Sequence, residues 1–224
     1  MGKILDASRF NPTSDIYEME FKRILAGITI CYQKMINEVS VPVNDENRIR
    51  DILLLKYLKN RKIKRIANLL EYRFDRETLE DISTGRVDIR IVSLNDFKID
   101  EAYYIIECKR LNNKNLIGTS GLNAEYVQNG ILRFVERKYS SFYHLNGMLG
   151  FIVESMDIDA NIQNINMLLE NDFKHSNTKD KLRLVIFIDN FKLSYSSLHE
   201  DIEGNKIKLF HLMFDFSQNI EKSV

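Results

Sequence analysis

The sequence predicts an α/β fold in which a mixed central β-sheet is flanked by helices, with extra helices at the N-terminus. Two observations lead to this prediction. Apolar residues recur at helical spacing through roughly the first 70 positions, whereas runs rich in β-branched and aromatic residues alternate with helical ones beyond Gly85. Helices that come before and between strands can cover the faces of a sheet.

The composition is that of a globular protein with one main domain. The 224 residues are 44% hydrophobic and include only nine glycines and two prolines, so the chain can bury a sizeable core. We divide it into an N-terminal helical element at 1–43, a main domain at 44–216 and a C-terminal tail at 217–224.

Charge, cysteine usage and hydropathy exclude several classes of protein. The 32 basic and 32 acidic residues balance, so net charge argues neither for nor against a nucleic-acid partner. Cys31 and Cys108 form no CxxC pair, which disfavours a disulfide framework or a zinc site. No apolar run approaches the length of about 18 residues that a membrane span needs. We therefore expect a cytoplasmic protein without a membrane partner.

The N-terminal third is predicted to be helical. A first long helix runs from Ser14 to about Glu38, and a second follows over 46–60 with Asp45 or Asn44 as its cap. The basic run at 59–65 either extends this second helix or begins a short third one. The apolar residues at helical spacing in the first helix are Ile16, Met19, Ile24, Ile28, Cys31, Met35 and Ile36.

The rest of the chain mixes strands and helices. Residues 86–94 and 98–111 read as two strands of a hairpin, because apolar and polar residues alternate in the first and β-branched and aromatic residues dominate the second. The later elements that we expect are a helix at 121–141, a strand at 146–155, a helix at 157–172, and strands at 182–191 and 206–216.

The hairpin places acidic residues opposite each other. If its turn is centred between Phe97 and Lys98, Asp88 faces Glu107 across the two strands. Like charges in opposition are destabilising unless a cation lies between them, and a divalent cation with oxygen ligands fits this need. Lys109 points to the same side as Glu107, because side chains alternate along a strand. Two carboxylates, a metal and a lysine are a functional set for phosphodiester hydrolysis.

The alternative is an ordinary solvated face of an edge hairpin. Against it, the residues around Glu107 are apolar on both faces of the strand, with Tyr104, Ile105, Ile106 and Cys108 close by in the sequence. A strand of this kind is covered on both sides, and charges are costly there unless they are paired or coordinated.

The segments "GRVDIRI" and "IIECKR" resemble the two halves of the active-site motif of the PD-(D/E)XK, or restriction-endonuclease-like, nucleases. The resemblance spans about 44–154, and Val87 stands where the motif has proline. It implies that Asp88, Glu107 and Lys109 carry the active site. It further implies a restriction-endonuclease-like core, with "EYRFDRE" as part of a first strand, and Mg²⁺ held by Asp88, Glu107 and the backbone carbonyl of Cys108, with Mn²⁺ able to substitute.

Glu46 is a further candidate at the start of the second helix. It lies one helical turn before Ile49 and two before Leu53, so it shares their inward-facing side. By the resemblance, Glu46 is linked to the metal from this preceding helix. The alternative is a carboxylate that is favoured near a helix N-terminus by the macrodipole.

The helix that follows the Glu-x-Lys strand carries the candidates for nucleic-acid binding. Its core stripe contains Val127, Ile131 and Phe134, while the adjacent stripe includes Tyr126, Gly130 and Arg133. By the resemblance, this helix lies near the scissile strand, with Gln128 reaching the active site and Tyr126 and Arg133 the phosphates. Alternatively, Gly130 allows tight packing on the sheet and Arg133 is an ordinary surface residue.

Other features carry less functional information. The run "KNRKIKR" offers five cations in seven residues for phosphates, although such runs are more often solvated helix faces. His211 alternates with apolar residues and reads as structural, while His144, His175 and His199 fall in apparent loops without metal-ligand spacing. No GxSxG or GxGxxG motif occurs.

Together these observations favour a Mg²⁺-dependent endonuclease, of the kind found in phage defence or in mobile elements. DNA is the expected substrate, since it is the commoner one in the superfamily, although nothing excludes RNA. Two alternatives stay open: a non-catalytic module that binds nucleic acid or protein on the same fold, and a subunit that is active only with a partner. A homodimer would allow both strands of a duplex to be cut.

Overall fold

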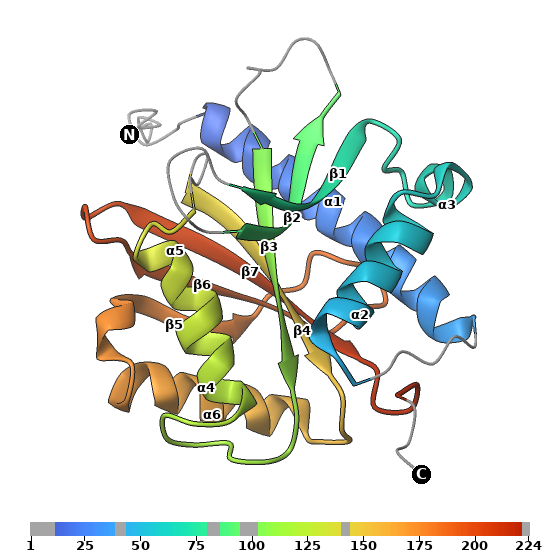
Figure 1. Ribbon diagram of the computed structural model, residues 1–224. Helices are drawn as coiled ribbons and strands as arrows, with labels where there is room; N and C mark the ends of the chain where they lie inside the picture. Colours follow the sequence, from blue (N-terminus) through green and yellow to red (C-terminus); the bar gives the residue numbers. More distant parts are fainter. Residues whose placement is uncertain (1–11, 39–43, 80–85, 95–102, 140–143, 221–224) are drawn as a thin grey trace, which may run out of the picture.

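The chain forms a mixed α/β structure around one seven-stranded sheet (Figure 1). The computed structural model describes residues 12–38, 44–79, 86–94, 103–139 and 144–220. Its strands are β1 (Tyr72–Leu79), β2 (Arg86–Ser93), β3 (Tyr103–Leu111), β4 (Leu145–Ile152), β5 (Thr178–Leu184), β6 (Ser194–Glu200) and β7 (Lys206–Asp215).

Helices precede the sheet and connect its strands. The α-helices are α1 (Pro12–Asn37), α2 (Glu46–Ile52), α3 (Arg61–Ile66), α4 (Leu122–Tyr126), α5 (Leu132–Val135) and α6 (Ile158–Asn171). Two π-helical turns, η2 (Leu53–Leu58) and η3 (Val127–Ile131), continue α2 and join α4 to α5, and η5 (Lys174–Ser176) is a short 3₁₀ turn.

The sheet contains both strand directions, as expected from the sequence. Its strand order is β1-β2-β3-β4-β7-β6-β5. The first three strands form an antiparallel meander. Strands β3, β4 and β7 run parallel to one another. Strand β6 pairs antiparallel with β7, and β5 pairs antiparallel with β6 at the opposite edge. The helical segment α4–η3–α5 connects the parallel pair β3 and β4, which need a crossover connection.

Two apolar cores lie on opposite faces of the sheet. On one face, α1, α2, η2 and α3 cover side chains such as Ile106 and Cys108 of β3. On the other face, α4, η3, α5 and α6 cover Ile105 and Leu111 of the same strand. Because side chains alternate along a strand, Glu107 and Lys109 point to this second face, away from Cys108.

The hairpin of β2 and β3 has the predicted register. Ile89 pairs with Ile106 and Val92 with Tyr103, which centres the connection between Phe97 and Lys98. The turn itself falls within 95–102, outside the described residues. "EYRFDRE", assigned to a first strand by resemblance, lies largely in β1.

The buried side of α1 differs from the predicted stripe. Ile24, Ile28, Cys31 and Met35 are buried as expected, but Ile16 and Met19 are exposed. Aromatic residues omitted from the predicted stripe take their place at the interface with the sheet: Tyr17 is buried, Phe21 stacks on Tyr104 and Tyr32 on Phe214.

Although α1 is the longest helix, none of the described helices is long and apolar enough to cross a membrane.

Capping residues determine where the next helices begin. The Asp45 side chain accepts a hydrogen bond from the backbone N–H of Arg48, so Asp45, rather than Asn44, caps α2. Asn60 caps α3 in the same way through the N–H groups of Lys62 and Ile63. The basic run therefore begins a separate short helix, and its charged side chains are mostly exposed.

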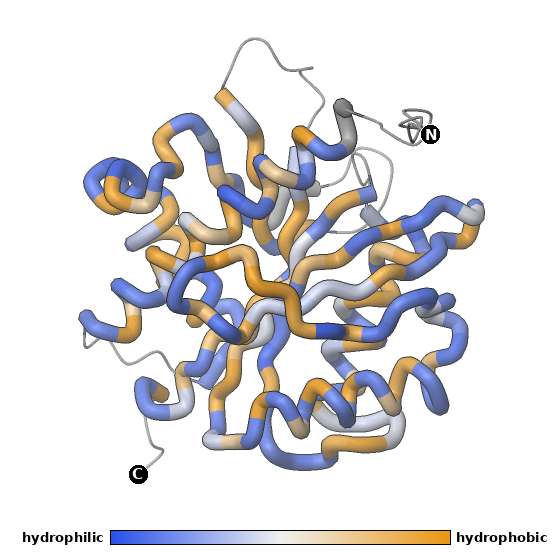
Figure 2. Tube along the Cα trace, turned by 180° about the vertical axis from the view of Figure 1, so that it is seen from behind, coloured by the Kyte–Doolittle hydropathy of each residue, from blue (hydrophilic) through white to orange (hydrophobic). Residues whose placement is uncertain are grey.

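The strand predicted at 182–191 is wrong over most of its length. Strand β5 ends at Leu184, and the next strand, β6, begins only at Ser194. The apolar run 185–188 instead crosses the back of the molecule outside any strand, where it appears as an orange stretch near the centre of Figure 2. Strand β6 was not predicted, because its serine-rich sequence lacks the apolar pattern of a buried strand. His199, predicted to lie in a loop, is in this strand.

Polar side chains explain how this serine-rich strand is buried. The Ser197 hydroxyl hydrogen-bonds to His199 Nε2 and His211 Nε2, each at 2.8 Å. Burial lowers the pKa of His211 to about 3 and that of His199 to about 4, so both rings are neutral near pH 7. The structural interpretation of His211 is therefore supported by its contacts.

Gly27 provides a test of the packing between α1 and the segment after α3. A Cβ atom at this position would lie 2.6 Å from the Ala67 carbonyl oxygen and 2.7 Å from Leu69 side-chain carbons. We expect Gly27→Ala to lower the free energy of unfolding by about 1–3 kcal/mol, because the backbone of Ala67 must shift to make room. Urea denaturation measures this change. Met19→Ala, on the exposed side of the same helix, should stay within about 0.5 kcal/mol of the wild type.

Candidate active site

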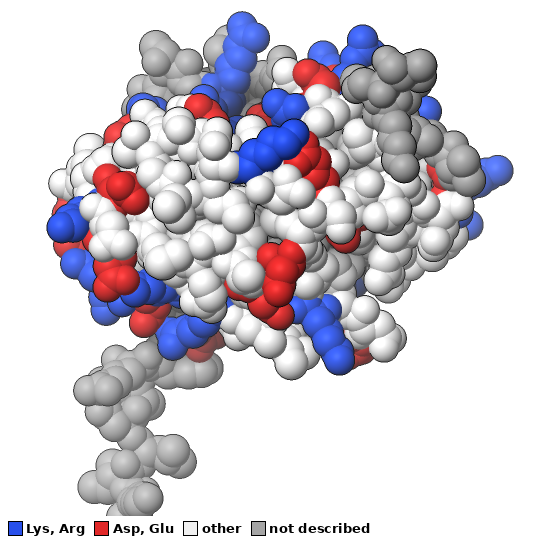
Figure 3. Space-filling model, turned by 90° about the horizontal axis from the view of Figure 1, so that it is seen from below, with Lys and Arg blue, Asp and Glu red and all other residues white. Residues whose placement is uncertain are grey.

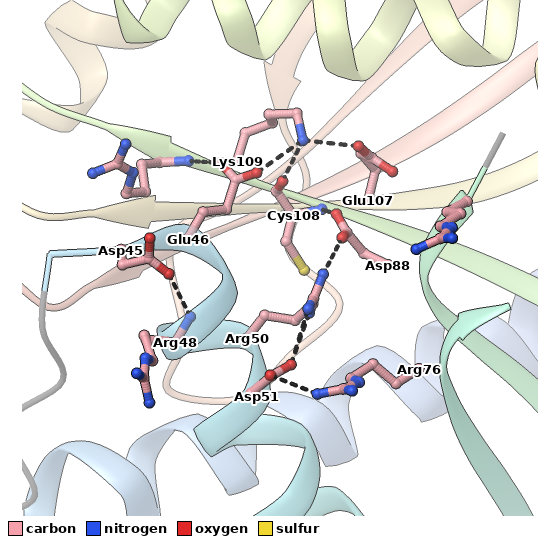
Figure 4. Close-up of polar contacts among 12 residues, drawn as sticks. Asp45, Glu46, Arg48, Arg50, Asp51, Arg76, Asp88, Glu107, Cys108 and Lys109 are labelled. Carbon is pink, nitrogen blue, oxygen red and sulfur yellow. Dashed lines mark hydrogen bonds and ion pairs between the residues drawn. The ribbon is translucent and has the colours of Figure 1, made fainter.

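The candidate active site lies where β2 ends its pairing with β3. The last pair of this ladder is Ile89 with Ile106, whereas β3 continues beside β4 to Leu111. The N-terminus of α2 lies along the edge of β3 that β2 leaves open (Figure 4). A strand edge of this kind exposes backbone donors and acceptors that need partners.

Two carboxylates supply those partners. The backbone N–H of Cys108 donates to Asp88 Oδ2 at 2.8 Å, and the N–H of Arg110 donates to Glu46 Oε2 at 3.0 Å. Asp88 comes from β2 and Glu46 from the first turn of α2. The open edge of β3 therefore gathers acidic side chains from two other elements.

Lys109 lies among the oxygens of this edge (Figure 4). Its ammonium donates to Glu107 Oε1 at 2.8 Å, to the Cys108 carbonyl oxygen at 2.7 Å and to Glu46 Oε1 at 3.1 Å. The ammonium thus brings together the strand that carries the Glu-x-Lys pair and the helix that carries Glu46.

Glu107 is the most deeply buried acid of the site, with its side chain 1% exposed. Besides Lys109, its Oε1 atom accepts from Arg133 Nη1 at 3.1 Å, and its Oε2 atom accepts from the Tyr139 hydroxyl at 2.8 Å. Arg133 also donates to the Tyr139 hydroxyl at 2.7 Å. Glu107 is therefore held from the sheet and from the segment that contains and follows α5.

Asp88 is held by a second cation. Arg50 Nη1 donates to Asp88 Oδ1 at 2.6 Å, while its Nε and Nη2 atoms donate to Asp51 Oδ1 at 3.1 and 3.0 Å. Asp51 Oδ2 in turn accepts from Arg76 Nη1 of β1 at 2.8 Å. Charges of alternating sign thus extend from the site to the first strand (Figure 4).

Burial and neighbouring charges change the proton affinities of the site. Burial, together with the negative charge of Asp88, raises the pKa of Glu107 to about 7, although Lys109 and Arg133 act in the opposite direction. Burial alone would lower the pKa of Lys109, but the carboxylates of Glu107 and Glu46 outweigh it and raise that pKa. Lys109 is therefore a persistent cation in this arrangement.

Most of the residues predicted from the sequence meet at this one place. The structure brings together the side chains of Glu46, Asp88, Glu107 and Lys109 with the Cys108 carbonyl. Arg133 joins them through Glu107, with a side chain that is 33% exposed. One part of its guanidinium therefore contacts the site while the side chain still reaches solvent.

Tyr126 does not occupy the position that phosphate binding requires. It is fully buried, and its hydroxyl hydrogen-bonds to His211 Nδ1 at 2.8 Å. The prediction placed Tyr126 and Arg133 on one stripe of a regular α-helix, but the π-helical turn η3 lies between them. A π turn has a wider spacing than an α turn, so the two side chains no longer share a direction.

Gln128 lies in the same turn but does not join the site. Its side chain is exposed and has no hydrogen-bond partner among the described residues. Gly130, in contrast, lies against the sheet: a Cβ atom there would be 2.5 Å from Met148 Cε and 3.5 Å from Lys109 Cγ. This glycine allows the close packing of helix on sheet that was the alternative to a substrate contact.

Two residues of the site escaped the sequence analysis. Arg50 follows Glu46 by one helical turn, and its place in the buried run "IRDILLL" was a signal that this cation needs an internal partner. Tyr139 ends the charged run "ERKY", where nothing in the sequence distinguishes it from a surface tyrosine.

The donor atoms are of the kind that hold Mg²⁺, namely carboxylate and carbonyl oxygens of Asp88, Glu107 and Cys108. Within the described segments, however, no three side chains of the His, Cys, Asp or Glu type are grouped closely enough to hold a metal ion. Lys109 and Arg50 already contact these oxygens. The site therefore fits Mg²⁺ in its chemistry, and its oxygens are shared with protein cations.

Comparisons of the chain with models of known protein families, with curated proteins and with solved structures found no match. Only the residues of the site and their arrangement indicate what the protein does.

The raised pKa of Glu107 leads to a prediction for the metal-free protein. We expect the side-chain carboxyl carbon of Glu107 to titrate with a midpoint of about 7 in an NMR experiment on glutamate-labelled protein. Lys109→Met should move the midpoint higher, because the ammonium of Lys109 lowers this pKa. A midpoint near the ordinary value of about 4.3 would contradict the burial of Glu107.

Folding stability should show the same titration. The folded state favours the neutral form of Glu107, so its contribution is fully present below the unfolded pKa and is lost as pH rises through about 7. Relative to Glu107→Gln, the wild type should therefore lose on the order of 3 kcal/mol between pH 4 and pH 8. Urea denaturation at several pH values measures this difference.

Proposed function

We propose that the protein is a metal-dependent nuclease of the restriction-endonuclease-like class. The observation that carries this proposal is the convergence of Asp88, Glu107, Lys109 and Glu46 at the open edge of β3. These residues come from three elements, α2, β2 and β3. An aspartate on one strand and a Glu-x-Lys on the next are what the resemblance requires.

The order of elements supports the same class. A helix, the meander β1–β2–β3, the helical crossover α4–η3–α5 and the parallel strand β4 follow one another. This is the order that the resemblance implies for a restriction-endonuclease-like core. The helical crossover also supplies Arg133 to the side chain of Glu107.

The proposed chemistry assigns each residue a separate task. Asp88, Glu107 and the Cys108 carbonyl would hold Mg²⁺ or Mn²⁺, which supplies Lewis acidity and an activated water when bound. Lys109, kept charged by Glu107 and Glu46, stabilises the negative charge that develops on the phosphate. Its raised pKa favours this task over removal of a proton from water. Glu46 holds the ammonium in place.

Substrate contacts are expected at the more exposed residues around the site. Arg133 has one nitrogen on Glu107, and its planar guanidinium presents other donors that match a phosphate. Gln128 is exposed on the preceding helical turn. Nucleic acid, with DNA expected before RNA, is the substrate that such contacts suit.

The face of the molecule seen in Figure 3 offers limited electrostatic attraction for a polyanion. Figure 3 shows one face on which basic and acidic side chains are interspersed among uncharged ones, and the sequence as a whole is neutral. Non-specific nucleic-acid binding depends largely on basic residues that neutralise phosphates. A weak intrinsic affinity, increased by a partner or by a second copy of the chain, is consistent with this surface.

One observation favours a second function. Each carboxylate oxygen of Glu46, Asp88 and Glu107 already has a donor from the protein. A non-catalytic module that binds nucleic acid or protein would use these ion pairs only to hold its fold together. The two functions differ in whether a divalent cation binds to Asp88 and Glu107.

A cleavage experiment tests the proposed function. The purified protein is incubated with duplex, single-stranded and branched DNA and with RNA, in Mg²⁺ or Mn²⁺. We expect metal-dependent cleavage that falls by at least about 100-fold in Lys109→Ala, because the positive charge that stabilises the transition state is removed. Lys192→Ala, which changes an exposed lysine outside the site, should cleave as well as the wild type.

Circular dichroism establishes that both variants are folded. Equal cleavage by wild type and Lys109→Ala would place the activity elsewhere. Absence of cleavage by the wild type would favour the binding module or a missing partner.

A further inference from the structure

Arg50 is a buried cation that the proposed chemistry leaves without a task. The residue is only 2% exposed and lies on the inward side of α2, one turn after Glu46. Its guanidinium contacts two carboxylates, Asp88 through Nη1 and Asp51 through Nε and Nη2 (Figure 4). A guanidinium at this depth is stable only while its charge is compensated.

Arg50 restricts the orientation of Asp88. One oxygen of Asp88 accepts from Arg50 and the other from the backbone N–H of Cys108. Two donors on the two oxygens fix the plane of the carboxylate relative to β3. A carboxylate oxygen has a second lone-pair site, so both oxygens of Asp88 keep the capacity to accept one more ligand.

Arg50 is itself held in place. Asp51 Oδ1 accepts from two of its nitrogens, and Asp51 Oδ2 accepts from Arg76 on β1. The Arg76 side chain is 43% exposed. The orientation of Asp88 is therefore supported by a succession of ion pairs that begins at the protein surface and ends at the backbone of β3.

We propose that Arg50 is a positioning residue for Asp88, which stays bound to it while a divalent cation binds to the other lone pairs of that carboxylate. This inference rests on the proposed nuclease function. Departure of Arg50 from Asp88 would leave a buried cation with part of its charge uncompensated. Lysine cannot replace it, because a single ammonium lacks the planar set of donors that bridges Asp88 and Asp51.

The opposite role makes a different prediction. If Arg50 competed with the metal for Asp88, weakening this ion pair would increase metal affinity. If Arg50 positions Asp88, weakening it lowers metal affinity, because the carboxylate must then be ordered when the metal binds. Metal affinity measured without substrate therefore distinguishes the two roles, and a purely structural role for Arg50 would not change it.

The test is calorimetric titration of the full chain with Mn²⁺ in the absence of nucleic acid. We expect Arg50→Lys to weaken Mn²⁺ binding by about 10- to 100-fold, the range typical for partners that orient metal ligands. Arg73→Ala, which removes an exposed arginine of β1 that pairs with Asp75 outside this succession of ion pairs, should change the affinity by no more than about twofold. Asp88→Asn defines the affinity that is left without the carboxylate.

A double substitution adds a control for indirect effects. If Arg50 acts through Asp88, Arg50→Lys combined with Asp88→Asn should bind Mn²⁺ no more weakly than Asp88→Asn alone. If Arg50→Lys does not fold, Asp51→Asn replaces it, because it loosens Arg50 without removing the buried charge. Asp51→Asn should weaken binding in the same direction and by a smaller factor.

The outcomes separate this inference from the proposed function. Unchanged or tighter Mn²⁺ binding in Arg50→Lys, with binding lost in Asp88→Asn, would overturn the role of Arg50 alone. Mn²⁺ binding that is absent in the wild type, or unaffected by Asp88→Asn, would overturn the nuclease proposal and this inference with it. Weaker binding in Arg50→Lys that is not additive with Asp88→Asn supports the positioning role.

Discussion

The site depends on the edge of β3 that β2 leaves unpaired. Backbone N–H groups of Cys108 and Arg110 need acceptors there, and the side chains of Asp88 and Glu46 provide them. A neighbouring strand would have satisfied the same groups with backbone carbonyls and would have left no room for carboxylates. The short ladder between β2 and β3 therefore explains why acidic residues gather at this position, and Glu107 and Lys109 follow from the alternation of side chains along β3.

Much of this arrangement was accessible from the sequence. The hairpin register needs only a turn position and period-two alternation, so Asp88, Glu107 and Lys109 could be grouped correctly. The positions of Ile49 and Leu53 placed Glu46 on the inward side of its helix, and the family resemblance linked it to the site. The mixed sheet flanked by helices was equally predictable, since long apolar periodicities determine which faces of the elements are buried.

The remaining features depend on tertiary interactions that no local pattern contains. The turn η3 widens the helix where Gly130 meets Met148, which separates Tyr126 from Arg133. The polar sequence of strand β6 does not resemble that of a buried strand. It can be buried because Ser197 hydrogen-bonds to two histidines. Arg50 and Tyr139 acquire their roles only through partners that are distant in the chain, at Asp88 and Glu107.

The pairing of the acidic oxygens with cations of the chain has a consequence for folding. Glu46, Asp88 and Glu107 are balanced by three cations of the chain itself, Lys109, Arg50 and Arg133. Small metalloproteins often unfold when a chelator removes the metal, because the free energy of metal binding supplies much of their folding free energy. Here Lys109, Arg50 and Arg133 compensate these carboxylates, so the mutual repulsion of the acidic residues does not oppose folding of the polypeptide alone.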